Sequence, residues 1–415
     1  MKTRPDTDER TVVAEEAVGA SGRVAAMFRG FPKQFWLQWS GILVNRLGTF
    51  VQPFLLLYLT NVRHLTEQQA GVIAATWGAG VLIGPLLGGW AADRLGRRNT
   101  MVGGMLLAAL TLAALGCARS WTSLLITAFL AGVAADIYRP ASAALIADII
   151  PAEKRARAYG LIFWAINLGF SAASALGGFL AAAGYTLLFA VDAGTCAIFA
   201  VIMFFFVPRD VAVKKEESDS SIGYGAVLRN RFMLALLALV LVYATVYEQA
   251  YVTLPLSIRD AGLPASVYGE VIAVNGVVIV LFQPWIAARL ERYNPYLVMG
   301  GAAFLLCCGL SLTGLANTPL TFALTVVAWS FGEASMAGVP QAIVAQAAPA
   351  GAQGKYQGAF TLARSGSTLT GPLLGTAVYS GVGHGALWGG CLALGFILLF
   401  GYSLLRRSAS SLDAP

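Results

Sequence analysis

The feature that most constrains this chain is a succession of apolar segments, each long enough to cross a lipid bilayer as a helix. A membrane-spanning helix needs about 20 predominantly apolar residues. Twelve such segments follow one another along the chain, at 36–60, 67–92, 99–118, 121–150, 156–183, 185–207, 231–258, 266–288, 295–316, 319–348, 355–382 and 384–405. None alternates apolar and polar residues as the strands of a membrane β-barrel do. We therefore expect an all-α integral membrane protein with twelve transmembrane helices.

The composition excludes a water-soluble enzyme. Hydrophobic residues make up 57% of the 415-residue chain and charged residues 12%, whereas soluble domains carry about 25% charged residues. The five cysteines lie in apolar runs without metal-ligand spacing, and the two histidines form no cluster. The sequence also lacks a nucleotide-binding motif and a nucleophilic triad. We expect neither a metal nor a cofactor, and no enzymatic activity.

The distribution of basic residues predicts the orientation. With the N-terminus placed in the cytoplasm, 22 of the 28 Lys and Arg residues fall in cytoplasmic segments and three fall in outer loops. Such an excess follows the positive-inside rule. We expect both termini in the cytoplasm and the protein in the inner membrane of a bacterium. The net charge of +7 then reflects topology and contact with anionic lipids, not binding to nucleic acid.

A polar segment at 208–230 separates two sets of six segments that resemble each other. Val72 and Pro85 in the first set correspond to Val271 and Pro284 in the second, and further matches recur at a nearly constant offset. Inverted or duplicated bundles of this kind rock about a central site. The predicted regions are an N-terminal cytoplasmic tail (1–35), a six-helix bundle (36–207), a cytoplasmic linker (208–230), a pseudo-symmetric six-helix bundle (231–407) and a cytoplasmic tail (408–415).

The loop after the second segment carries a long motif. It reads Gly89-Trp90-Ala91-Ala92-Asp93-Arg94-Leu95-Gly96-Arg97-Arg98. This resembles the G-x-L-A-D-R-x-G-R-[RK] signature of the major facilitator superfamily, with Ala91 in place of the usual leucine, and the resemblance covers about 36–407. It implies a secondary transporter and a cytoplasmic gate at Gly89, Asp93, Arg94, Gly96, Arg97 and Arg98. Asp93 is placed to pair with a basic residue or a helix N-terminus of the opposite half; alternatively, the arginines only signal topology.

A second segment resembles one branch of that superfamily. Tyr138-Arg139-Pro140-Ala141 and the residues that follow, through Asp148 to Arg155, are similar to helix four and its loop in bacterial drug:proton antiporters. Asp148 lies near the cytoplasmic end of its segment, as a gate or loop-anchoring residue would.

Ionisable residues near the bilayer midplane are costly unless paired or hydrated, and each is a candidate for function. Arg46, Asp136, Arg139, Glu248 and Glu333 lie in segments one, four, seven and ten, which in the superfamily line the central cavity. Proton coupling needs a carboxylate that is neutral in one state and charged in another. Pairing of Asp136 with Arg139 or with Arg46 would supply such a switch, unless the pair is static. The secondary candidates Asp192 and Arg364 are expected to act mainly as helix-packing partners.

Aromatic and amide side chains add a second layer. Tyr243, Tyr247 and Tyr251 recur every four residues and share one helix face. The polar residues that could orient a substrate or join helices are Asn45, Gln52, Asn167, Asn275 and Gln283. Tyrosines beside carboxylates suit lipophilic or cationic aromatic compounds, although packing accounts for such tyrosines equally well.

These observations predict a proton-coupled exporter of small lipophilic or aromatic compounds, acting as a monomer in the lipid bilayer with protons and a small-molecule substrate as its partners. The alternative is a proton symporter of a small metabolite or peptide, in which Asn45 and Arg46 would bind an anionic group. A membrane receptor is less favoured, and ATP-driven transport is disfavoured because no phosphate-binding loop occurs.

Overall fold

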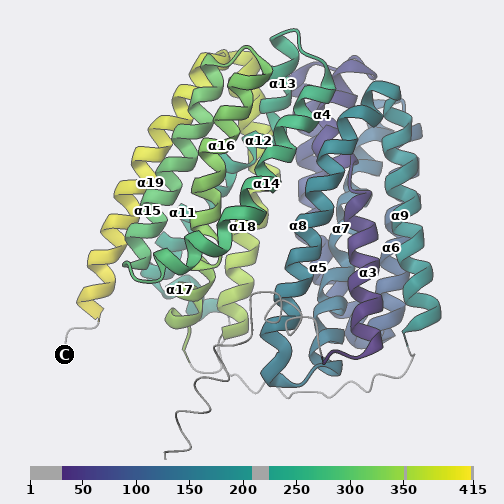
Figure 1. The fold of residues 1–415 in the computed structure, drawn as a ribbon, viewed down its shortest axis with the longest axis horizontal. Coiled ribbons are helices and arrows are strands. Elements are labelled where there is room, and N and C mark those ends of the chain that lie inside the picture. Colours follow the sequence, from purple (N-terminus) through teal and green to yellow (C-terminus); the bar gives the residue numbers. More distant parts are fainter. Residues whose placement is uncertain (1–29, 208–223, 350–352, 413–415) are drawn as a thin grey trace, which may run out of the picture.

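The computed structural model describes residues 30–207, 224–349 and 353–412, and every regular element in these ranges is a helix (Figure 1). Most of the predicted tail 1–35 and of the linker 208–230 lies outside these residues, as do the last three residues of the tail 408–415. The helices of the N-terminal half are α3 (Lys33–Leu47), α4 (Val51–Asn61), α5 (Glu67–Leu95), α6 (Arg97–Cys117), α7 (Trp121–Ile149), α8 (Ala152–Ala183) and α9 (Tyr185–Phe206).

The C-terminal half repeats this arrangement with more interruptions. Its helices are α10 (Tyr224–Arg229), α11 (Arg231–Tyr247), α12 (Gln249–Val252), α13 (Leu254–Asp260), α14 (Ala265–Leu290), α15 (Pro295–Ser311) with the 3₁₀ turn η1 (Leu312–Leu315), α16 (Pro319–Met336), α17 (Val339–Ala347), α18 (Gln353–Gly381) and α19 (His384–Leu412). Within the described residues, eleven helical stretches are long and apolar enough to cross a membrane. Helix α18, at the predicted segment 355–382, is not one of these eleven, because serines, threonines and glycines dilute its apolar residues.

The helix starts follow from local sequence. The side chains of Thr66, Ser120 and Thr318 each accept a hydrogen bond from the backbone N–H three residues later. The backbone N–H of each in turn donates to the side chain of that later residue, which forms capping boxes for α5, α7 and α16. Such caps satisfy amide groups that a helix leaves without partners in its first turn. The long helices therefore begin close to the positions that the apolar pattern predicts.

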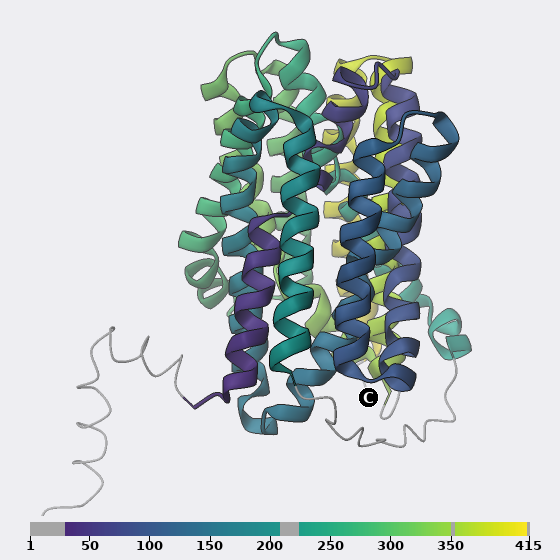
Figure 2. The ribbon, with the colours of Figure 1, turned by 90° about the vertical axis from the view of Figure 1, so that its right-hand side faces the viewer.

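The helices pack as two bundles that meet along two seams. In the N-terminal half α7 packs against α5 and α6, and α9 against α6 and α3; in the C-terminal half α15 packs against α16 and α19, and α11 against α18. The halves touch mainly where α5 meets α18 and where α8 meets α14. In Figure 2 the N-terminal half, purple to teal, faces the viewer, with green and yellow helices behind it.

The backbones of α5 and α18 touch at their seam, and this contact requires a glycine. A Cβ atom added to Gly78 of α5 would overlap the backbone of Thr368 in α18. Helices that lack a side chain at the crossing can approach closely enough for van der Waals contact between their backbones. The two halves are thus held by shape at this seam.

Three of the predicted continuous segments are interrupted, which corrects the sequence-based expectation. The segment 36–60 breaks between α3 and α4, the segment 231–258 divides into α11, α12 and α13, and the segment 319–348 breaks at Gly338. Gly338 has φ +79°, a left-handed conformation that glycine adopts without steric cost. Interrupted helices in transporters are typical of sites near the middle of the bilayer.

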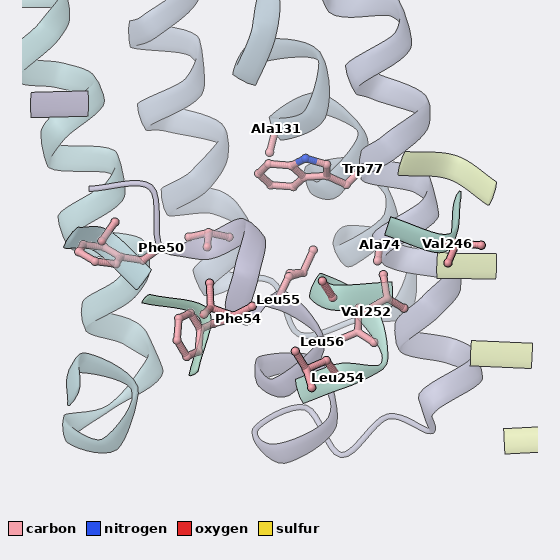
Figure 3. Packing of buried hydrophobic residues seen from close by; sticks show 14 of the residues in the cluster. Phe50, Phe54, Leu55, Leu56, Ala74, Trp77, Ala131, Val246, Val252 and Leu254 are labelled. Atoms are coloured by element: carbon pink, nitrogen blue, oxygen red, sulfur yellow. The ribbon is translucent and has the colours of Figure 1, made fainter. Parts of the chain in front are cut away.

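One end of the interface between the halves is sealed by apolar side chains (Figure 3). Phe54, Leu55 and Leu56 of α4 lie beside Val252 of α12 and Leu254 of α13, and all five are buried. Helices α4 and α13 stand together at the top of Figure 1. We call this the outer end, because the predicted outer loops lie there, and the opposite end, near α17, the cytoplasmic end.

Candidate functional site

A central cavity lies between the two halves and has two compartments. The central compartment, of about 340 Å³, includes Arg46, Asp136 and Glu248 in its lining. The lower compartment, of about 520 Å³, lies toward α17 and includes Glu333. Residues from both halves line each compartment, and those that the two compartments share are Arg139, Tyr243, Ala244, Tyr247 and Arg364. The cavity therefore brings together the midplane charges that the sequence singled out.

The N-terminal wall of the cavity carries an ion pair. Arg139 Nε lies 2.9 Å from Asp136 Oδ1, three residues earlier on α7. The Asp136 side chain is 14% exposed and that of Arg139 is 52% exposed, so the arginine faces the open cavity. Of the two pairings that the sequence left open, this conformation contains Asp136 with Arg139.

Arg46 lies close to this pair but contacts a different group. Its guanidinium donates a hydrogen bond to the hydroxyl of Tyr138, at 3.0 Å, while its Nε atom is buried and has no hydrogen-bond partner. Tyr138 is itself held by an edge contact with Phe199 of α9. A buried guanidinium without a carboxylate at ion-pair distance retains much of its attraction for an anion.

Glu333 on α16 lies at the lower compartment and is held by neutral donors. The hydroxyl of Tyr247 donates to its Oε1 at 2.8 Å, and the amide of Asn275 donates to its Oε2 at 2.7 Å. Within the described ranges, no Lys or Arg nitrogen lies within 4.0 Å of the Glu333 carboxylate. Tyrosine hydroxyls and amides donate hydrogen bonds to a charged carboxylate. Because these donors are neutral, they do not hold the carboxylate in its charged form as a cation would.

Glu248 occupies the break between α11 and α12, on the opposite side of the cavity from Asp136. Ser367 of α18 donates a hydrogen bond to its Oε1 at 3.5 Å, a long and weak contact. Gly371 of α18 leaves room for its side chain, since a Cβ there would meet the Glu248 Cβ at 2.6 Å. A carboxylate at a helix break, with a single weak hydrogen bond, is free to exchange partners.

The predicted tyrosine face is present. Tyr243, Tyr247 and Tyr251 all line the central compartment, and the hydroxyls of Tyr247 and Tyr251 share a hydrogen bond of 3.0 Å. Trp329 packs edge-on against Tyr247, and Phe170 from the N-terminal half does the same to Tyr251. Aromatic rings from both halves thus border the site beside Glu333.

Asn45 and Asp192 have structural partners that the sequence did not reveal, and Arg364 lies where packing alone would not place it. Asn45 is buried and donates to the sulfur of Cys196 at 3.3 Å. Asp192 accepts two backbone hydrogen bonds at the start of α4, at 3.1 and 3.2 Å. Arg364, expected to be a packing residue, lines both compartments, so it belongs with the charged residues of the cavity.

The gate motif forms its contacts within the N-terminal half. Arg97 lies 3.0 Å from Asp93 and 3.4 Å from Asp148 of α7. Arg98 donates to the carbonyl of Phe204 in α9. The Asp93 side chain is 73% exposed, so in this conformation it is available for the predicted contact with the opposite half but does not make it.

The rest of the motif fits a tight turn on the membrane surface. Arg94 lies over the ring of Trp90, with 4.8 Å between its guanidinium carbon and the ring centroid. Gly96 has φ +84° and joins α5 to α6. A Cβ at Gly89 would meet nothing within 4 Å, so this glycine is not required for close packing here.

A cross-half ion pair closes the outer end above the cavity. Arg259 of α13 contacts Glu67, the first residue of α5, at 2.5 Å and its neighbour Asp260 at 2.6 Å. Tyr379 of α18 donates to the other oxygen of Asp260 at 2.8 Å. We call Glu67, Arg259, Asp260 and Tyr379 the outer latch. Arg259 and Asp260 fall just after the predicted segment 231–258, so Arg259 is one of the three basic residues that the charge distribution places in outer loops.

Neutral polar side chains at and beside the cavity carry no charge by which the sequence could mark them. Thr245 and Thr370 share a hydrogen bond of 2.7 Å between α11 and α18, and Ser365, Ser367 and Thr368 line the central compartment. The serine- and threonine-rich stretch from Ser365 to Thr370 interrupts an otherwise apolar segment. That interruption was the available signal for a polar helix face.

Comparison with known proteins places this architecture. The family model described as Major Facilitator Superfamily matches residues 39–372 and 259–414. A Na⁺, Li⁺, K⁺/H⁺ antiporter of Planococcus maritimus is 22% identical over 353 residues, which cover 77% of this chain and 83% of the antiporter. The quinolone resistance protein NorA of Staphylococcus aureus is 29% identical over 172 residues, which cover 41% of this chain and 44% of NorA.

A solved structure extends the likeness to the whole fold. A POT family transporter in complex with 5-aminolevulinic acid superposes with a TM-score of 0.76 at 14% identity, covering 93% of this chain and 98% of that one. Together with the family match, the apolar helices and the central cavity, this fold leaves one assignment. The chain belongs to the Major Facilitator Superfamily and is a multi-pass membrane transport protein.

Proposed function

We propose that this transporter exports small lipophilic or aromatic compounds in exchange for protons, by alternating access across a bacterial inner membrane. It would span the membrane with twelve helices and keep both termini in the cytoplasm. The observation that carries the proposal is Glu333, a carboxylate at the cavity that neutral donors hold beside a cluster of aromatic rings.

The environment of Glu333 suits an exchange of proton and substrate at one group. When charged, the carboxylate accepts the hydrogen bonds from Tyr247 and Asn275 and attracts a cation into the cavity. When protonated, it loses that attraction and the substrate leaves. A permanent ion pair would hold the carboxylate charged in both states, and Glu333 makes none within the described part of the chain.

The aromatic wall favours lipophilic compounds. Tyr247 and Tyr251 line the central compartment, and Trp329 and Phe170 pack edge-on against them. Aromatic faces attract apolar surface and organic cations alike. The similarity to NorA, named for quinolone resistance, and to a cation/proton antiporter supports an exporter and proton coupling.

The arrangement of the halves supports alternating access. Apolar side chains of α4, α12 and α13 and the outer latch join the halves at the outer end, while the lower compartment reaches toward α17 at the cytoplasmic end. A substrate in the cytoplasm would enter this conformation. Release outside requires the outer contacts to part and the cytoplasmic contacts, Asp93 included, to form.

Transport of ethidium, a lipophilic aromatic cation, into inside-out proteoliposomes tests the proposal. With an imposed pH gradient, acidic in the lumen, wild-type protein should accumulate ethidium, and collapse of the gradient should abolish the accumulation. Glu333→Gln should lose the gradient-driven component. The matched control is Glu291→Gln, which neutralises an exposed carboxylate beyond the end of α14 and should transport normally. Gradient-driven accumulation that survives Glu333→Gln would contradict this role for Glu333.

One observation favours a second candidate, a proton symporter of a small metabolite or peptide. Arg46 lines the central compartment and pairs only with the Tyr138 hydroxyl among the described residues, so its charge is available to an anionic group. Asn45 lines the same compartment, where its amide nitrogen donates to the sulfur of Cys196. Uptake of a radiolabelled dipeptide down an imposed proton gradient, with no ethidium transport, would favour the symporter.

A further inference from the structure

A second buried carboxylate borders the cavity on the N-terminal side, outside the group that the proposed exchange uses. Asp192 of α9 is 5% exposed and lies in the lining of the central compartment. One of its oxygens accepts hydrogen bonds from the backbone N–H groups of Phe50 and Val51, at 3.2 and 3.1 Å. These amides belong to the start of α4, on a different helical segment and far away in sequence.

This contact holds the break in the first predicted membrane segment. Helix α3 ends at Leu47, and α4 begins at Val51 after a turn through Gly48. The first amides of a helix lack partners within it, and their aligned dipoles carry partial positive charge. Within the described chain no side chain of the segment itself caps α4, so the carboxylate of Asp192 does so from a neighbouring helix.

The break between α3 and α4 lies next to Arg46, which lines the central compartment. Arg46 precedes it by two residues and is tied to α7 by its bond to Tyr138. A shift of the α3–α4 turn would therefore move Arg46 relative to Asp136 and Arg139. Through the capping contact, the charge of the Asp192 carboxylate thus influences where Arg46 lies on the N-terminal wall of the cavity.

The surroundings of Asp192 are apolar apart from a few groups. From α9 itself, Cys196 places its sulfur 3.9 Å from the second carboxylate oxygen; α3 supplies Arg46, and α7 places Asp136 and Arg139 across the compartment. From α6, which packs along α9, the lining residues are Met105, Ala108 and Leu112. The carboxylate can thus be reached by a proton through the cavity, and in the described ranges it forms no direct ion pair.

We infer that Asp192 is a proton-dependent clamp on the break in the first membrane segment. The charged carboxylate fixes the start of α4 and keeps Arg46 against Tyr138. Protonation adds a hydrogen to one oxygen and removes the charge, which weakens both capping bonds and releases the turn. Asp192 is then a positioning residue, since it acts on the cavity through Arg46. The inference rests on the proposed proton coupling for its role in transport.

Hydrogen–deuterium exchange tests the clamp without requiring transport. Wild-type protein in lipid nanodiscs is compared between about pH 5 and about pH 8, with exchange rates corrected for their intrinsic dependence on pH. Peptides that contain the amides of Phe50 and Val51 should exchange about tenfold faster at the acidic end, because charge-assisted hydrogen bonds are about twice as strong as neutral ones. Asp192→Asn, which keeps an acceptor oxygen but cannot change charge, should exchange rapidly at both ends.

Two controls separate the clamp from general effects. Asp148→Asn neutralises a carboxylate on α7 that pairs with Arg97 at the cytoplasmic end, and it should keep the wild-type pH response. Asp192→Ala removes the acceptor entirely and should exchange fastest at every pH. Protection that is unchanged between the two pH values in the wild type, or a wild-type response in Asp192→Asn, would overturn the inference.

Failure of the clamp and failure of the proposed exporter function give different results. A pH-dependent amide response in a protein that does not couple ethidium to protons would leave the clamp in place and refute the exporter. Proton-coupled ethidium transport with no pH response at Phe50 and Val51 would refute the clamp alone. In transport assays, Asp192→Asn should show a flattened pH profile.

Discussion

The outer latch offers the sharpest test of how the halves are held. Arg259 joins Glu67 of the opposite half at 2.5 Å and Asp260 of its own half at 2.6 Å. Glu67→Gln removes the charge that crosses between the halves and leaves the Arg259–Asp260 pair in place. We expect the variant to populate conformations with an open outer end more than the wild type does.

The magnitude follows from the exposure of the pair. The side chains of Arg259 and Glu67 are 29% and 20% exposed, so water and salt screen part of their attraction. Partly exposed pairs of this kind contribute about 1 kcal/mol. A change of this size shifts the ratio of closed to open outer ends by about fivefold. High salt should reduce the difference between variant and wild type, because ions screen the pair in the same way.

Distances between spin labels measure this ratio directly. Cysteines introduced at the exposed positions Arg119 and Asn317 place one label on each half at the outer end, in a background with the native cysteines replaced. The fraction of the longer distance should rise in Glu67→Gln. Asp260→Asn is the matched control, since it removes a carboxylate from the same cluster but leaves the cross-half contact. An unchanged distance distribution in Glu67→Gln, or an equal shift in both variants, would refute the reasoning.

Further predictions address the seam, the cavity, the gate motif and the orientation. Gly78→Ala should lower both the melting temperature and the transport rate, because its Cβ would overlap the Thr368 backbone. In the same thermal unfolding assay, the control Gly103→Ala should melt at the wild-type temperature, because a Cβ there meets nothing within 4 Å. Tyr247→Phe removes one hydrogen bond to Glu333 and should weaken ethidium binding by about fivefold, given about 1 kcal/mol for such a bond; equal affinities in a fluorescence titration would contradict this. Asp93→Asn should lower the unfolding free energy by less than about 1 kcal/mol in a denaturant titration, because the Asp93 side chain is largely exposed and its pair with Arg97 is screened by water. A membrane-impermeant maleimide should label the exposed Cys117 from outside intact cells and leave the buried Cys196, Cys307 and Cys391 unlabelled until the protein is denatured.

The helical character of the apolar segments and the shared faces of residues on one helix could be predicted from the sequence, because both follow from local rules. An apolar stretch of bilayer length has only one stable backbone form in a single pass. Asp136 and Arg139 had to share a helix face, since residues three apart on a helix are neighbours. Their ion pair and the common tyrosine face of Tyr243, Tyr247 and Tyr251 are both present in the structure.

The interruptions of the helices could not be predicted in the same way. The α3–α4 break depends on Asp192, which lies more than a hundred residues further along the chain, and only the folded arrangement brings the two together. Gly338 is one of 46 glycines. Pro340 follows it in the first turn of α17 and is a local sign of a helix boundary, but the apolar pattern continues across both residues. Such breaks are tertiary features that a hydropathy pattern averages away.

The partners of charged residues were similarly hidden. The motif predicted that Asp93 would contact the opposite half, yet Arg97 on the next turn of its own half is within reach at 3.0 Å. Arg364 was expected to pack between helices, but its position on the polar face of α18 places it in both compartments. Sequence spacing fixes a residue's depth and helix face, whereas its partner depends on how the two bundles are rotated against each other.

The measurement that tests the central claim most directly is substrate-driven proton movement. Proteoliposomes loaded with a pH-sensitive dye receive ethidium without an imposed gradient, and the internal pH is followed for wild type and for the double variant Asp136→Asn with Glu333→Gln. The account predicts that ethidium drives protons across the membrane in the wild type and that the double variant moves none. Substrate-dependent proton movement that persists in the double variant would contradict the account, and ethidium binding without any transport would favour a receptor instead.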